Sequence, residues 1–145
     1  MFVWRGDVEM SIRLIDGEFP DYDKVIPTDR ISEVRVPQHS LFRALRRVSL
    51  LSSDRYRGVR VEFKDGNMAI SANNPDLGEA VEELDVEYVG ALLTVGYNAQ
   101  YLLDILGALE QGDQVELALK DEQSPTLLRR NGNDSLLYVV MPMRI

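Results

Sequence analysis

Few residues of this chain are of the types that carry out covalent chemistry. Cysteine is absent, which excludes thiol nucleophiles, disulfides and thiolate metal sites. His39 is the single histidine, so a multi-histidine metal site is excluded and only one residue is left for a histidine base. No glycine-rich phosphate loop and no Gly-Lys pair occurs. Asp21, Asp23 and Asp29 remain as carboxylates that could hold a magnesium ion, although aspartate beside proline is also ordinary turn chemistry.

Arginine is the second kind of residue whose spacing suggests chemistry. The segment 34–53 holds four arginines, the first of them Arg35, and no carboxylate. Arg43, Arg46 and Arg47 are spaced i, i+3 and i+4, so they share one face of a helix. A solvated helix face explains this pattern, and sequence-independent contact with nucleic-acid phosphates is the alternative. The 16 basic and 24 acidic residues give a net charge of −8, which excludes a uniformly basic nucleic-acid surface but not a local one.

An acidic segment with no basic partner lies further along the chain. Its members are Asp76, Glu79, Glu82, Glu83, Asp85 and Glu87. A solvated loop and an edge strand explain them, because charged side chains keep a strand edge from pairing with other chains. The same charges repel phosphate, which indicates an outer surface.

The chain ends on an apolar tail, Val139 to Ile145. Proline cannot donate to a strand ladder, so Pro142 ends the last strand and Met143 to Ile145 are expected to leave the sheet. Exposed methionines suit a surface that accepts several partners. A final strand with methionine as core filler is the alternative interpretation.

Hydrophobic periodicity predicts that two similar halves position these residues. The expected elements are strands at 31–36, 59–63, 68–72 and 84–88 around a helix that opens at Pro37, then strands at 93–96, 115–119, 126–130 and 136–141 around a helix capped by Asn98. The ends of the first strand of each half, Val36 and Gly96, are 96 − 36 = 60 residues apart. The duplication predicts an α+β fold, a repeated β-α-β-β-β unit with two helices packed on antiparallel sheets.

Residues 1–27 follow a different pattern. Val8, Met10, Ile12 and Leu14 alternate with polar residues, which predicts a hairpin with one buried face after the turn at Gly6. Prolines and acids in the segment 16–27 favour an extended connector, so a boundary is expected at 27/28. No apolar stretch approaches the ~20 residues of a membrane span and no export signal is present, so the expected location is cytoplasmic.

Four short motifs together resemble a known family. They are Phe19–Tyr22, Arg57–Arg60, Ala72–Pro75 and Tyr138–Ile145, and in this order they resemble the bacterial sliding clamp, the beta subunit of DNA polymerase III. The resemblance runs the whole length and implies the DNA-clamp fold. It implies that residues 1–27 are the closing strands of the middle clamp domain and the linker, and that residues 28–145 are the third domain. The first domain and most of the second would then be missing from this chain.

The resemblance also implies a function without catalysis or cofactor. In the family, two subunits close a ring around duplex DNA and act as a processivity factor, with helices lining the hole. Arg43, Arg46 and Arg47 would then face DNA, whereas the second helix region carries acids and no basic residue. The subunit interface would use Leu50, Leu51, Asp76, Glu79, Glu82 and Glu83. Without the first domain, this chain is not expected to form the ring.

In the family, the tail forms a hydrophobic pocket for a short linear peptide carried by DNA polymerase and clamp-loader subunits. The matching positions here are Pro20, Lys24, Val25, Tyr56, Asn98, Tyr101, Val139, Val140, Met141, Pro142, Met143, Arg144 and Ile145. Lys24 stands where arginine is common and lacks its planar fork. Gln123 and Pro125 stand near the pocket where small or apolar residues are usual.

Two other functions stay open at this point. One is a free-standing adaptor that binds such peptides without forming a ring. The other is a metal-dependent hydrolase that uses Asp21, Asp23 and Asp29, for which magnesium-dependent phosphoesterase activity would be the discriminating observation.

Overall fold

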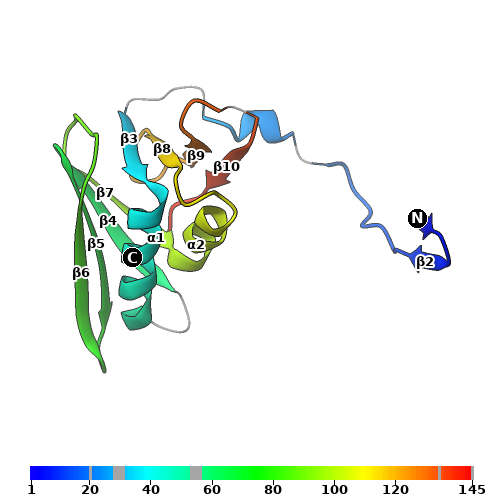
Figure 1. Ribbon diagram of the computed structural model, residues 1–145, viewed down its shortest axis with the longest axis horizontal. Helices are drawn as coiled ribbons and strands as arrows, with labels where there is room; N and C mark the ends of the chain where they lie inside the picture. Colours follow the sequence, from blue (N-terminus) through cyan, green and yellow to red (C-terminus); the bar gives the residue numbers. More distant parts are fainter. Residues whose placement is uncertain (20, 28–31, 53–56, 134, 145) are drawn as a thin grey trace.

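The computed structural model describes residues 1–19, 21–27, 32–52, 57–133 and 135–144 (Figure 1). Its strands are β1 (Phe2–Arg5), β2 (Val8–Ser11), β3 (Ser32–Pro37), β4 (Gly58–Lys64), β5 (Asn67–Asn74), β6 (Gly78–Asp85), β7 (Leu93–Asn98), β8 (Gln114–Leu119), β9 (Thr126–Arg130) and β10 (Leu137–Val140). Its helices are α1 (Gln38–Val48) and α2 (Ala99–Gly107), with short 3-10 turns η1 (Tyr22–Lys24) and η2 (Ser49–Leu51). The duplicated β-α-β-β-β unit is therefore confirmed as β3-α1-β4-β5-β6 followed by β7-α2-β8-β9-β10.

The two halves exchange their first strands. One four-stranded sheet has the order β10-β9-β8-β3 and the other has the order β6-β5-β4-β7, and all pairs are antiparallel. Strand β3 of the first half thus pairs with β8 of the second half, and β7 of the second half pairs with β4 of the first. Neither half completes its own sheet, so the two halves must fold as one unit.

The core lies between the two helices and the two sheets. Helix α1 buries Leu41, Leu45 and Val48, and α2 buries Leu102 and Leu106. Figure 1 shows the two helices next to each other, with β4, β5 and β6 running along one side of them. This arrangement is the predicted α+β packing of two amphipathic helices on antiparallel sheets.

Single backbone bridges join the two sheets at their edges. Arg35 on β3 exchanges hydrogen bonds with Glu87, both at 3.0 Å between nitrogen and oxygen, just beyond the end of β6. On the opposite side, the Met143 N–H donates to the Gly96 carbonyl oxygen on β7 at 2.8 Å. As predicted, pairing with β9 ends before Pro142 and the chain leaves that sheet, and Met143 then bridges β7 of the other sheet.

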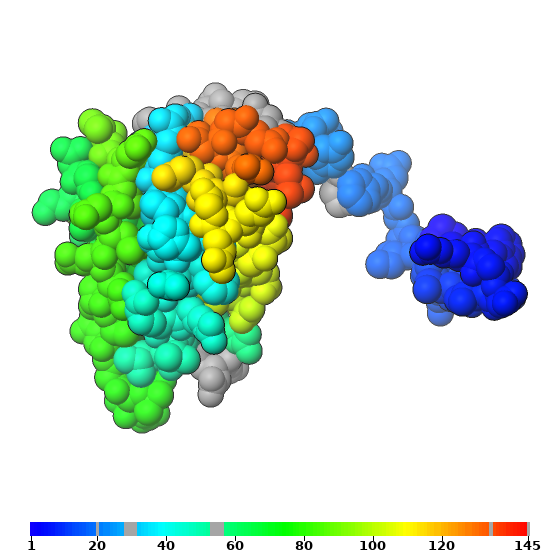
Figure 2. Space-filling model, in the orientation of Figure 1, coloured from blue at the N-terminus to red at the C-terminus, as the bar shows by residue number. Residues whose placement is uncertain are grey.

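The N-terminal hairpin of β1 and β2 stands apart from this domain (Figure 2). All eight of its strand residues are exposed, so the predicted buried face is absent among the described residues. The register puts Phe2 and Trp4, whose rings stack 6.2 Å apart, on one face and Met10 beside Val3 on the other. Both faces thus carry apolar side chains, and the second strand ends at Ser11, before Leu14.

No helix among the described residues is long and apolar enough to cross a membrane.

Candidate functional site

Helix α1 presents the predicted arginine face. Pro37 keeps an extended backbone and ends β3, so the helix begins at Gln38, one residue later than expected. Gln38 is buried and donates its Nε2 hydrogen to the Leu106 carbonyl oxygen at 2.6 Å, which ties the start of α1 to α2. Arg43 and Arg46 are exposed, and neither guanidinium has an ion pair within the described parts of the chain.

Arg47 is held by an acid that was predicted to serve a different site. Its Nε and Nη2 donate to the two carboxylate oxygens of Glu82 at 2.5 and 2.8 Å, a two-pronged pair between α1 and β6. The hydrogen bonds from Arg47 lower the pKa of the Glu82 carboxyl and raise the pKa of the Arg47 guanidinium. The predicted DNA-facing arginines and the predicted subunit interface therefore share a direct contact.

The predicted interface residues gather around β6, which is an edge strand paired only with β5. Leu50 on η2 is 76% exposed and Leu51 is half-buried. Side chains alternate along a strand, so Glu79 and Glu83 point outward while Glu82 points toward α1. Asp76 is exposed in the turn before β6, where its backbone N–H donates to the Asn74 side chain at 3.0 Å.

The predicted peptide pocket is described in part. Pro20, Tyr56 and Ile145 lie outside the described residues. Val140 is buried, whereas Val139 and Met143 are half-buried and Met141 is 58% exposed. Tyr101 on α2 is 60% exposed and Val25 is 45% exposed, so apolar side chains are open to solvent on three separate segments. Of the other two predicted tail members, Pro142 is half-buried and Arg144 is exposed.

Asn98 and Lys24 have local partners. The Asn98 side-chain oxygen accepts from the Gln100 N–H at 2.9 Å, which confirms the predicted N-cap of α2 and fixes the first turn that carries Tyr101. The Lys24 ammonium lies 3.0 Å from Asp21 in an exposed ion pair. Such a pair contributes little to stability, so Lys24 stays available to a ligand.

Comparison with known proteins assigns the family. The family model described as DNA polymerase III beta subunit, C-terminal domain, matches residues 23–144. The chain belongs to this family.

Individual relatives agree with this assignment. The beta sliding clamp of Pseudomonas putida (strain KT2440) is 43% identical over 140 residues, which are 97% of this chain and 38% of that protein. A solved sliding clamp from Pseudomonas aeruginosa bound to griselimycin superposes with a TM-score of 0.86 at 43% identity, over 92% of this chain and 36% of that one. The beta subunit from Thermotoga maritima gives a TM-score of 0.87 at 32% identity, over 99% and 39%. The chain thus spans a little over a third of the length of its curated relative.

The structure does not support the hypothesis that a hydrolase uses Asp21, Asp23 and Asp29 to bind a metal ion. Asp21 pairs with Lys24, and Asp29 lies outside the described residues. Within the described ranges, no group of three histidine, aspartate or glutamate side chains is placed to hold a metal ion.

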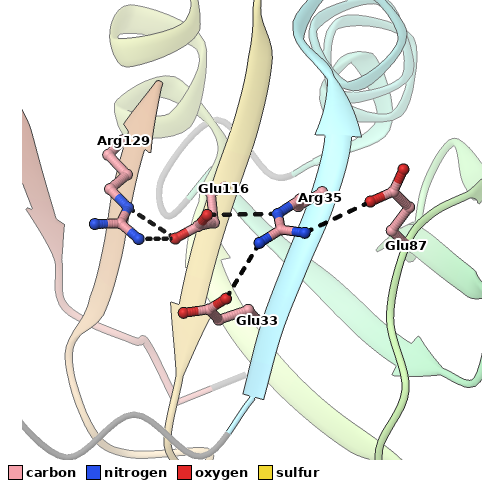
Figure 3. A network of polar contacts seen from close by, with 5 residues as sticks. All are labelled: Glu33, Arg35, Glu87, Glu116 and Arg129. Atoms are coloured by element: carbon pink, nitrogen blue, oxygen red, sulfur yellow. Dashed lines mark hydrogen bonds and ion pairs between the residues drawn. The ribbon is translucent and has the colours of Figure 1, made fainter. Parts of the chain in front are cut away.

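A row of alternating charges was missed in the sequence of this beta-subunit domain. Arg35, Glu116 and Arg129 face one another across β3, β8 and β9, and Glu87 extends the row at the junction of the sheets (Figure 3). Glu116 is only 2% exposed, although it alternates in sequence with the apolar Val115 and Leu117. It accepts from the Arg129 Nε at 2.7 Å and lies 3.5 Å from the Arg35 Nε.

The charge row also changes the interpretation of Arg35. This residue belonged to the basic segment 34–53, but its guanidinium lies within 4 Å of Glu33, Glu87 and Glu116. Arg35 is therefore a structural residue at the sheet junction. Opposite charges at directly paired strand positions could have indicated the row. To find such pairs one must know the strand register, which the sequence pattern does not contain.

Proposed function

We propose that this chain acts as the C-terminal part of a DNA sliding clamp, a non-catalytic processivity factor that tethers DNA polymerase to duplex DNA. Membership of the beta-subunit family over residues 23–144 carries this proposal. Residues 1–27 would be the closing strands of the middle domain and the linker, and residues 28–145 the third domain. A protein with this task works on chromosomal DNA, so a cytoplasmic location follows from the proposal.

In the ring, α1 would face the DNA. Arg43 and Arg46 are exposed on one helix face and lack ion pairs among the described residues, which supports non-specific contact with phosphates. Arg47 would contribute less, because Glu82 already occupies its donors. Two or three charges give weak binding that falls with salt, which suits a protein that slides.

The edge of β6 and the exposed Leu50 would meet a second subunit. The unpaired strand edge, the apolar side chain and the outward acids Glu79 and Glu83 support a contact with an apolar, basic surface. Such a head-to-tail contact joins two different surfaces, so a chain with only one of them does not close a ring by itself. A free-standing adaptor would share the peptide pocket but lack this contact.

The pocket would take a short peptide that ends in leucine and phenylalanine. Val25, Tyr101 and Met141 offer exposed apolar surface for it, and Lys24 adds a positive charge. Burial of each large apolar side chain stabilises a complex by about 1.5–3 kcal/mol, so two of them minus the cost of association give roughly micromolar affinity or weaker.

Titration of a fluorescent motif peptide into the chain tests the proposed function. Met141→Ser and Tyr101→Ala should each weaken binding by about tenfold, since each removes one apolar wall. Leu136→Ser is the matched control, because Leu136 is 52% exposed just before β10 but outside the predicted pocket. Point variants are preferable to removing the tail, which would also remove the Met143–Gly96 hydrogen bond. Equal binding by all three folded variants would overturn the assignment.

A further inference from the structure

A polar groove of about 380 Å³ lies beside the tail on the outer face of the β6-β5-β4-β7 sheet. Arg60 and Thr94 line it from the sheet, Glu122 from the loop before β9, and Met143 and Arg144 from the tail. The predicted pocket and this groove therefore share the tail.

The strand register explains why this part of the sheet is hollow. Arg60 on β4 lies directly opposite Gly96 on β7, and Gly96 in turn lies opposite Met143. Arg60 is exposed while its neighbours Val59 and Val61 are buried, so this row faces away from the core. Gly96 contributes no side chain, which leaves a gap between the Arg60 and Met143 side chains.

The charges of the groove have no partners in the described chain. Arg60 and Arg144 make neither an ion pair nor a side-chain hydrogen bond to any described residue, and Glu122 also lacks a pair. The groove thus carries a formal charge of +1 on a chain of net charge −8. Unpaired guanidinium groups are strong donors to carboxylates.

Hydrogen bonds to the Asp121 carboxylate hold the loop beside Glu122. The Asp121 carboxylate accepts from the N–H groups of Gln123 and Ser124 at 2.8 and 2.6 Å, and these bonds lower the pKa of that carboxyl. The carboxylate is therefore ionised at neutral pH and keeps these hydrogen bonds, so a ligand meets a preformed edge.

We propose that this groove binds carboxylate side chains of an acidic segment flanking the peptide that docks in the tail pocket, with Arg60 as the specific contact. The inference rests on the proposed function and adds a second, electrostatic contact to it. A carboxylate between Arg60 and Arg144 would accept hydrogen bonds from both unpaired guanidinium groups. Glu122 opposes anions in the same groove, which favours a few carboxylates of a short segment over a long run of phosphates.

The test compares peptides that share the apolar motif. One has three acidic residues before the motif, one has them after it, and the controls have serine at those positions. At low salt, one acidic peptide should bind about three- to tenfold more tightly than its serine control, the gain expected for one or two exposed charge pairs. The gain should disappear in Arg60→Ser, grow in Glu122→Gln and persist in Arg13→Ser, a matched change at an exposed arginine outside the groove.

Several outcomes separate the groove from the pocket. The serine peptides report the pocket alone, so their failure to bind would overturn the proposed function. A free acidic tripeptide that shifts the Gly96 amide resonance would still support the groove in that case. No gain with either acidic peptide, or a gain that survives Arg60→Ser, would overturn the inference. Preferential binding of a short oligonucleotide that depends on Arg60 would assign the groove to phosphate instead.

Discussion

At the scale of single residues, the burial of the charged Glu116 side chain depends on its two arginine partners. Its carboxylate is almost fully buried and its charge is compensated by Arg129 and Arg35 (Figure 3). A buried ion pair need not stabilise a fold over an apolar substitute, but removal of one partner leaves a buried charge without compensation. The alternation of Val115, Glu116 and Leu117 suggested a solvated side chain, because local periodicity describes a strand's faces and not what covers them.

Arg129→Met should therefore destabilise the domain by about 3 kcal/mol, since Arg35 alone remains near the buried carboxylate. Urea unfolding followed by circular dichroism measures the change. Adding Glu116→Gln to that variant should recover part of the loss, because the uncompensated charge is then gone. Loss of the same size in Arg46→Met, where the guanidinium is exposed and unpaired, would show that the row plays no special part.

At the scale of elements, periodicity predicted most strands and both helices but not their partners, and it placed at 84–88 the strand that runs from Gly78 to Asp85. The alternation in 59–63 and the helical spacing of Leu41 and Leu45 correspond to β4 and α1. The exchange of β3 and β7 between the halves was not predicted, because pairing depends on contacts remote in sequence. For the same reason the pair between Arg47 and Glu82 was missed, and the two residues were assigned to separate sites.

The contact between α1 and β6 should be visible as a coupling between Arg47 and Glu82. A double-mutant cycle with Arg47→Ser and Glu82→Gln should give a favourable coupling for stability that shrinks in 1 M salt. Arg47 lowers the pKa of Glu82, so the coupling is present above the ordinary glutamate pKa of about 4.3 and is lost as the pH falls below it.

DNA binding provides the second measurement on these variants. Arg43→Ser or Arg46→Ser should each reduce the salt dependence of DNA binding more than Arg47→Ser does, because only Arg47 is already paired. A larger loss of salt dependence in Arg47→Ser would show that Arg47 contacts DNA as much as Arg43 and Arg46 do.

At the scale of the whole molecule, the domain from β3 to β10 packs its two sheets around two helices, whereas nothing described packs on the hairpin of β1 and β2. Bridges at Glu87 and Met143 join the two sheets around the helices. The hairpin has no such cover: Trp4 is 67% and Val8 65% exposed. Sequence alternation suggested a buried face there, which requires a partner that the described residues of the domain do not supply.

We therefore expect the chain to self-associate through residues 2–14 as its concentration rises, because apolar side chains and free strand edges attract one another. Sedimentation velocity should show a shift from monomer to dimer that Trp4→Ser combined with Val8→Ser prevents. Trp4 is the only tryptophan, so its fluorescence should move to shorter wavelength with association and reports on the hairpin directly. Leu50→Ser is the control at an equally exposed site on the other end of the domain, and it should leave the association unchanged. Association that depends on Leu50 and is indifferent to Trp4 would mean that the β6 edge, and not the hairpin, joins the copies.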